Sequence, residues 1–208
     1  MPQVAGSEDR RAQIVAAALR VLAREGLAGA TTRRIAAEAG VNVATLNYHF
    51  GGKDELLASV LEETTRMFAT AVRRAIRTDS GLRAALEHGL AALWQVVEAT
   101  PDLQLLQYEL TAYALRHRGS EWLARQQYES YRGVTEALLT EACREAGESC
   151  AIPVGELASI LLAGLDGLII QFVVDRDSAR AAGGLRRLTE AVTTLADPQP
   201  APRQEAAS

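Results

Sequence analysis

The chain has 208 residues, of which 48% are hydrophobic and 23% are charged, and its formal net charge is −4 at pH 7. This length is sufficient for a sizeable core in one large domain or two smaller ones. Two cysteines are too few for a disulfide-stapled secreted scaffold, and no Cys/His cluster has the spacing of a structural zinc site. Taken alone, the negative charge argues against a nucleic-acid partner.

The distribution of charge changes this interpretation. Residues 1–54 contain seven Lys and Arg against five Asp and Glu, a net charge of +2, whereas the remainder carries −6. Such asymmetry is compatible with a basic arm on an acidic body.

Neither a signal peptide nor a membrane span is expected. Residues 1–9 contain no apolar stretch. The longest apolar run, residues 157–174, is just long enough to span a bilayer. It carries Asp166 near its centre, where an acid costs roughly 3 kcal/mol on insertion. We therefore predict a soluble cytoplasmic protein.

Apolar residues recur at helical spacing along the chain, alanine is abundant, and no alternating β-branched run is present. The sequence predicts an all-α fold without strands. The expected helices cover residues 8–25, 32–39, 43–50, a long segment from Lys53 to a stop at residues 79–81, and then residues 82–98, 101–118, 121–146, 153–174 and 178–195.

Capping and turn residues set the first boundaries. Ser7 is the expected N-cap of the first helix and Gly26 its C-terminal stop. Thr31 or Thr32 is expected to cap the second helix, and Asn42 the third. Residues 40–41 form a tight turn between these two short helices, so the pair has the layout of a helix-turn-helix.

The third helix, NVATLNYHF with its cap, is not a simple core helix. Leu46 and Phe50 lie four residues apart and form one apolar stripe. The remaining positions carry hydroxyl, amide and imidazole groups of the kind that contact phosphates and base edges. Lys53 lies in the first turn of the next helix, where an acid is normally favoured, and a phosphate opposite it accounts for a cation there.

The segment TTRRIAAEAGVNVATLNYHFGGKDELL resembles the DNA-binding signature of the TetR family of bacterial transcription regulators, and the resemblance covers about residues 10–57. It implies an N-terminal three-helix DNA-binding domain and a C-terminal helical domain for ligand binding and dimerisation, in an Ω-shaped homodimer of nine-helix subunits. We expect the domains at residues 8–54 and 55–196, with disordered ends at 1–7 and 197–208.

The resemblance also implies roles for individual residues. The positions that match phosphate contacts are Thr32, Arg33, Thr45, Tyr48, His49 and Lys53. The positions that match base contacts are Val43, Ala44 and Asn47. Two of these depart from the family pattern. Position 47 is often aromatic, and the Asn here has the groups to read adenine bidentately, whereas position 43 is often Lys, and Val offers only apolar contact.

Residues 153–174 are apolar nearly all round, as expected of a helix buried on both sides. The resemblance places an intersubunit four-helix bundle here, built with residues 178–195. The residues expected at this dimer interface are Gly155, Ala163, Gly164, Gly167, Ile170, Leu185 and Leu188.

The resemblance also implies that the central helices bind an unidentified small-molecule effector and that binding moves the helix that starts at Lys53. No cofactor or metal is expected. The candidate pocket residues are Met67, Phe68, Trp94, Gln104, Leu105, Gln107, Tyr108, Glu109, Tyr113, Trp122, Tyr128, Tyr131, Asp166 and Phe172. For Asp166, contact with a ligand amine or hydroxyl and an intersubunit hydrogen bond are equal alternatives.

The leading hypothesis is thus a ligand-responsive repressor that binds a palindromic double-stranded operator as a homodimer. The alternatives are a helical-bundle enzyme or carrier, and an activator or ligand-free regulator on the same fold. Against an enzyme, the chain has no nucleophile elbow, phosphate loop or Glu-x-x-His pair. For Cys143 and Cys150, inert thiols and a redox switch both stay open.

Overall fold

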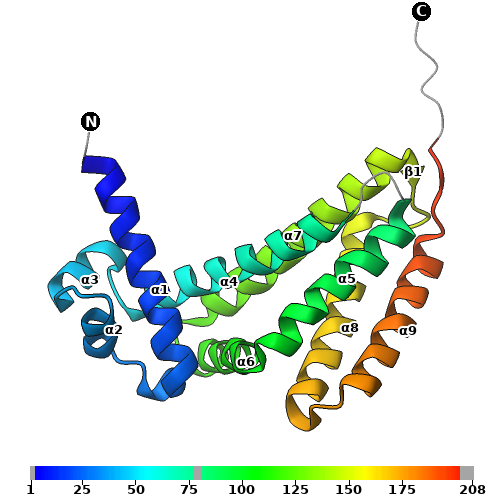
Figure 1. The fold of residues 1–208 in the computed structure, drawn as a ribbon. Helices are drawn as coiled ribbons and strands as arrows, with labels where there is room; N and C mark the ends of the chain where they lie inside the picture. The colour runs from blue at the N-terminus through cyan, green and yellow to red at the C-terminus, as the bar shows by residue number, and fades with distance from the viewer. Residues whose placement is uncertain (1–2, 77–80, 202–208) are drawn as a thin grey trace, which may run out of the picture. The chain divides into compact units, whose positions relative to one another are not determined.

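The structure is a computed structural model that describes residues 3–76 and 81–201. Its helices and strands are drawn in Figure 1. In chain order they are α1 (Gln3–Gly29), α2 (Thr32–Glu38), α3 (Val43–Phe50), α4 (Lys53–Ala75), α5 (Gly81–Ala99), α6 (Pro101–Arg116), α7 (Glu121–Ala146), β1 (Glu148–Ser149), α8 (Val154–Asp175), α9 (Ser178–Ala196) and β2 (Gln199–Pro200). The predicted all-α class is confirmed, and most predicted helix ends lie within two residues of the observed ones.

The N-terminal boundary was predicted wrongly. α1 begins at Gln3, so Ser7 lies inside the helix and is not its N-cap, and residues 3–7 are helical where disorder was expected. Gln3 and Ala5 are residues that favour helices, and the helix begins before the expected cap. Gly26, the predicted stop, does interrupt the helical backbone, with φ 65° and ψ 177°.

The expectation of no strands was also wrong, at one place among the described residues. β1 and β2 form a two-residue antiparallel ladder, with Glu148 opposite Pro200 and Ser149 opposite Gln199. The backbone N–H of Ala201 donates to the carbonyl of Gly147 at 2.7 Å, so residues 197–201 are ordered where disorder was expected. The rest of that tail, and the predicted stop at residues 79–80, lie outside the described residues.

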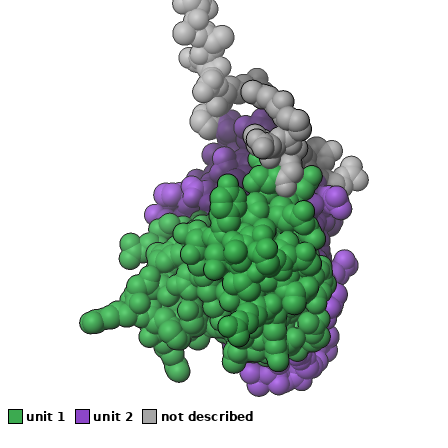
Figure 2. Space-filling view, turned by 90° about the vertical axis from the view of Figure 1, so that its left-hand side faces the viewer, with its two compact units in different colours: residues 1–67, 101–129 green, residues 68–100, 130–208 purple. Residues whose placement is uncertain are grey.

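The chain divides into two compact units (Figure 2). Unit 1 comprises Met1–Met67 and Pro101–Glu129, and unit 2 comprises Phe68–Thr100 and Ser130–Ser208. Unit 1 therefore holds α1, α2 and α3 with most of α4 and all of α6. The boundary predicted between residues 54 and 55 stays a prediction.

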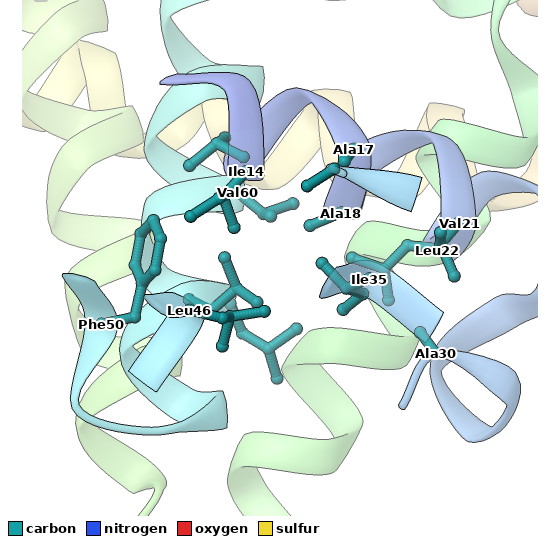
Figure 3. Packing of buried hydrophobic residues seen from close by; sticks show 14 of the residues in the cluster. Ile14, Ala17, Ala18, Val21, Leu22, Ala30, Ile35, Leu46, Phe50 and Val60 are labelled. Atoms are coloured by element: carbon teal, nitrogen blue, oxygen red, sulfur yellow. The ribbon is translucent and has the colours of Figure 1, made fainter. Parts of the chain in front are cut away.

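The main core of unit 1 joins the three N-terminal helices to α4 and α6. Ile14, Ile35, Leu46 and Val60 come from four different helices, point toward one another and are fully buried (Figure 3). Each short helix thus has one apolar stripe in the core, which fixes which of its faces points to solvent.

Unit 2 has a core of its own, built from α5, the end of α7, α8 and α9. The hairpin of α8 and α9 is packed closely (Figure 1), because glycines of each helix receive leucines of the other. A Cβ at Gly164 would lie 2.4 Å from Leu188, and one at Gly184 would lie 2.4 Å from Leu168.

Candidate nucleic-acid interface

Two side-chain caps and a glycine turn shape the α2–α3 pair. Thr31, rather than Thr32, caps α2 by accepting a hydrogen bond from the backbone N–H of Arg34 at 3.3 Å. Asn42 caps α3 as predicted, since its Oδ1 accepts from the backbone N–H of Thr45 at 2.7 Å. Gly40 lies between the helices with φ 65°, a backbone conformation that other residues rarely adopt.

The two faces of α3 differ sharply in burial. Leu46 and Phe50 are fully buried in the core of unit 1, whereas Asn47 is exposed and Tyr48 has 85% of its surface accessible. The ring of Tyr48 meets that of His49 edge-on at 5.4 Å, and His49 is half-buried. The burial of one stripe therefore directs an amide and a phenol into solvent side by side.

Of the predicted phosphate contacts, Arg33 and Lys53 are the cations. Within the described part of the chain neither of them forms an ion pair. Other arginines nearby are paired: Arg34 bonds Glu25, and Arg20 bonds Glu38 at 2.8 Å. This hydrogen bond from Arg20 lowers the pKa of the Glu38 carboxyl.

The two threonines of the predicted set are half-buried. The Thr45 hydroxyl donates to Asn42 Oδ1 at 3.0 Å, so this hydroxyl must rotate before it can donate to a phosphate. Thr32 lies in the first turn of α2, where backbone N–H groups are free of helical partners.

The three predicted base contacts are not equally available. Ala44 and Asn47 are exposed, whereas Val43 is half-buried and packs against the core of unit 1. Part of the Val43 side chain is thus covered by the core of unit 1. Asn47 is the only one of the three that carries an amide.

Arg11 is a positioning residue that sequence reasoning missed. Its guanidinium donates to the carbonyl of His49 at 2.9 Å and to Ser59 Oγ at 2.7 Å. It also lies over the Phe50 ring, 4.4 Å from the ring centroid. Arg11 therefore holds the C-terminal end of α3 from α1, and no local sequence pattern indicates contacts across 38 and 48 residues.

Asp54 is a second missed residue, next to Lys53 at the start of α4. Its carboxylate accepts hydrogen bonds from the Tyr113 hydroxyl at 3.1 Å and from Ser120 Oγ at 2.5 Å. Burial, and next the hydrogen bond to Asp54, raise the pKa of Tyr113. The Tyr113 ring stacks on His117 with centroids 4.0 Å apart. These contacts tie the first turn of α4 to the turn between α6 and α7.

The candidate pocket residues fall in both units. Those in unit 1 are Met67, Gln104, Leu105, Gln107, Tyr108, Glu109, Tyr113, Trp122 and Tyr128, and those in unit 2 are Phe68, Trp94, Tyr131, Asp166 and Phe172.

Their environments differ as well. Met67, Leu105, Trp122 and Tyr128 are exposed to solvent. Glu109 is engaged inside the fold, since it accepts a hydrogen bond from the Leu27 N–H at 3.1 Å, beside the break in α1.

Two buried polar groups among the candidates have no hydrogen-bond partner within the described residues: Trp94 Nε1 and Gln104 Nε2. Trp94 packs edge-on against Phe172 in unit 2, with ring centroids 5.5 Å apart. Gln104 lies in unit 1 and is 4% exposed. A buried N–H without an acceptor is costly, so both are candidates for ligand contact. Across the described residues, no group of His, Cys, Asp and Glu is arranged to hold a metal ion.

Packing inside the chain accounts for some of the predicted dimer residues. Gly164 and Leu188 pack against each other, Leu185 is buried, and Gly155 lies against Glu136 of α7. The remaining three are Ala163, which is exposed, Gly167, which faces open space, and Ile170, which is 39% exposed.

Helix α8 is long and apolar enough to cross a membrane by length and composition, with a mean hydropathy of 2.2 in its most apolar window. Only 28% of that window is buried. Its exposed apolar residues include Ile160, Ile170 and Val174, the last with 80% of its surface accessible.

Comparison with known proteins agrees with this geometry. Residues 14–60 match the family described as bacterial regulatory proteins, tetR family. The chain is 28% identical over 173 residues to the HTH-type nicotine-responsive transcriptional repressor HdnoR of Paenarthrobacter nicotinovorans, covering 83% of this chain and 88% of the relative. It is 27% identical over 196 residues to the HTH-type transcriptional regulator BetI of Paraburkholderia phymatum, covering 94% and 97%.

Solved structures share the fold. A TetR-family transcriptional regulator from Rhodococcus sp. has a TM-score of 0.73 at 18% identity, covering 91% of this chain and 99% of its own. The multidrug binding protein EbrR, solved with imidazole, has a TM-score of 0.67 at 27% identity, covering 94% and 93%. The chain thus belongs to the TetR family and is a DNA-binding transcriptional regulator.

Proposed function

We propose that the chain is a repressor that binds a palindromic operator as a homodimer through α3 and leaves the DNA when a small molecule binds. The observation that carries the DNA-binding surface is the division of α3: Leu46 and Phe50 are fully buried, while Asn47 and Tyr48 project into solvent. A recognition helix needs this combination of a fixed inner face and a polar outer face.

In this proposal the contacts divide by chemistry. Asn47 carries the amide that pairs with N6 and N7 of adenine, and Ala44 offers a methyl group to a thymine methyl. Tyr48, His49, Thr32, Thr45, Arg33 and Lys53 bind phosphates and fix the register. The two cations of this surface, Arg33 and Lys53, form no ion pair within the described residues. Two such charges give the DNA-binding surface of one chain little affinity, so binding relies on two chains together.

The exposed face of α8 supports the homodimer. Ile160, Ala163, Gly167, Ile170 and Val174 recur at alternating spacings of three and four, which aligns them along one side of the helix. A second copy covering this stripe removes it from water and leaves no need for a membrane. We therefore place the protein in the cytoplasm with its DNA.

The proposed effector is a small organic molecule bound by the helices that follow residue 54. Support comes separately from Trp94 Nε1 in unit 2 and Gln104 Nε2 in unit 1, which have no hydrogen-bond partner among the described residues and each suit a ligand acceptor group. The relative HdnoR is nicotine-responsive and EbrR was solved with imidazole, so nitrogen heterocycles form a first library to screen. A ligand releases the operator only if it favours a state of the dimer in which the two α3 helices do not fit half-sites about 34–36 Å apart.

The test is an unbiased selection of random duplex DNA by the full chain at about 100 mM salt, where nonspecific binding is weak. We expect the selected pool to contain a palindrome with half-sites spaced by one or more helical turns, bound by two chains per site. Failure to retain any sequence overturns the proposal, and selection of an asymmetric site bound by one chain overturns the homodimer.

A further inference from the structure

Two cysteine sulfurs lie together in unit 2, outside the surfaces described above. Cys143, near the end of α7, is 6% exposed, and Cys150, just after β1, is half-buried. Both are free thiols, and their Sγ atoms are 3.4 Å apart. A disulfide joins sulfurs about 2 Å apart, so closing the bond requires a movement of about 1 Å.

The segment that carries Cys150 is held from several directions. Glu148 accepts a hydrogen bond from the backbone N–H of Leu82 at 2.8 Å, at the start of α5. The Ala151 N–H donates to the carbonyl of Ala196 at 2.7 Å, and β1 pairs with β2. The sulfur of Cys150 is therefore kept beside that of Cys143 by the surrounding fold.

The two thiols differ in their readiness to react. Burial, and next the neighbouring Cys150 and Glu148, raise the pKa of Cys143 to about 12. Cys143 is therefore a neutral thiol at physiological pH and a poor first nucleophile. Cys150 is the more accessible of the two, and an oxidant from solvent reaches it first.

We propose that Cys143 and Cys150 are a redox-active pair that hydrogen peroxide converts into an intramolecular disulfide. Cys150 loses its thiol proton, and the thiolate attacks one peroxide oxygen, so that the O–O bond breaks and Cys150 becomes a sulfenic acid. The hydroxide that leaves takes up the proton released by Cys150 and becomes water. The Cys143 sulfur then attacks the Cys150 sulfur, gives up its proton and expels the oxygen as water. In total, two thiols are oxidised and one peroxide is reduced to two waters.

This disulfide would tie the end of α7 to the segment that caps α5 and pairs with β2. Cross-linking removes conformational freedom from the unfolded chain, so the oxidised protein is expected to be the more stable form. The contact bears on the stability of unit 2 and does not depend on DNA binding.

Peptide mapping tests the bond directly. The full-length protein is treated with hydrogen peroxide, alkylated, and digested with trypsin, which cleaves after Arg144 between the two cysteines. We expect a cross-linked peptide pair that is lighter by two hydrogen atoms and that dithiothreitol separates, and Cys150→Ser abolishes it. Alkylation of both cysteines, oxidation of Cys150 beyond sulfenic acid with Cys143 still alkylated, or a disulfide between chains overturns the proposal.

Thermal unfolding tests the stabilisation. The oxidised wild type is expected to melt about 5 °C above the reduced form, whereas Cys150→Ser melts at one temperature under both conditions. An oxidised wild type that melts at or below the reduced form contradicts the proposed effect on unit 2, even where the bond forms.

Discussion

Asn47 and Tyr48 stand at consecutive positions of α3, and the structure exposes both. Their groups suit different parts of DNA: an amide has a donor and an acceptor for a base edge, and a phenol donates to a phosphate. Substitution at Asn47 is therefore expected to change which sequence is bound, and substitution at Tyr48 to change how strongly any sequence is bound.

Asn47→Ala is predicted to relax discrimination at one base pair of each half-site by about 1–3 kcal/mol, because the bidentate contact is lost. The measurement compares the affinities of wild type and variant for the selected operator and for its single-base variants. Leu115→Ala, at an exposed position of α6 outside the proposed DNA-binding surface, is the control and is expected to keep the discrimination at that base pair. Unchanged affinity ratios for Asn47→Ala would show that Asn47 does not read a base.

The sequence predicted the roles of individual residues correctly where their contacts lie within the same helix or its cap. The Asn42 cap and the stripe of Leu46 and Phe50 follow from spacings of three and four residues, which helix geometry fixes. Arg11 and Asp54 were missed, because their partners lie 38 to 66 residues away and are brought near only by the tertiary fold.

At the scale of elements, α4 begins next to the proposed DNA-binding surface and is anchored there by Asp54. Removing this carboxylate leaves the Tyr113 hydroxyl and Ser120 Oγ without their acceptor, at a site that is partly buried. Asp54→Ala is predicted to lower the free energy of unfolding by about 1–3 kcal/mol.

Urea denaturation measures this loss. Glu55→Ala is the matched control, since Glu55 is an exposed acid in the same first turn and its removal is expected to cost about 0.5 kcal/mol. Equal losses in the two variants would mean that Asp54 acts only through the helix dipole and does not anchor α4.

The break in α1 depends on a glycine conformation. Gly26 combines φ 65° with ψ 177°, a region that is essentially limited to glycine. Gly26→Ala is predicted to lower the free energy of unfolding by about 1–3 kcal/mol. Gly133→Ala, inside α7 with nothing within 4 Å of the added Cβ, is expected to raise it by about 0.5–1 kcal/mol. If Gly26→Ala leaves the free energy of unfolding unchanged, the backbone conformation at position 26 does not require glycine.

The sequence predicted helices well where helical spacing and end signals agree. α3 and α7 both have the predicted bounds, although α3 has 8 residues and α7 has 26. The ladder of β1 and β2 was missed, since two residues per strand carry no alternation and their pairing comes from contacts across the fold.

At the scale of the whole molecule, the acidic net charge and DNA binding are reconciled by separation along the chain. Residues 1–54 carry +2 and the remainder −6. The apolar run that resembled a membrane span forms α8, whose exposed stripe we assign to a second copy of the chain.

Ile170→Glu combined with Val174→Glu is predicted to shift the protein from dimer to monomer, because two charges per chain would be buried against their own copies. Sedimentation velocity measures the shift. Leu115→Glu in α6, where Leu115 is 67% exposed, is the matched control and is expected to stay dimeric. A double variant that sediments like the wild type would place the interface elsewhere.

If the exposed face of α3 binds DNA, Tyr48→Ala has a lower affinity for the selected operator than the wild type. We expect a loss of about tenfold or more at about 100 mM salt, because a hydrogen bond to a charged phosphate is removed from each half-site. Circular dichroism is expected to be unchanged, since the side chain is 85% exposed. Leu115→Ala is expected to bind like the wild type. Wild-type affinity for Tyr48→Ala would contradict the account.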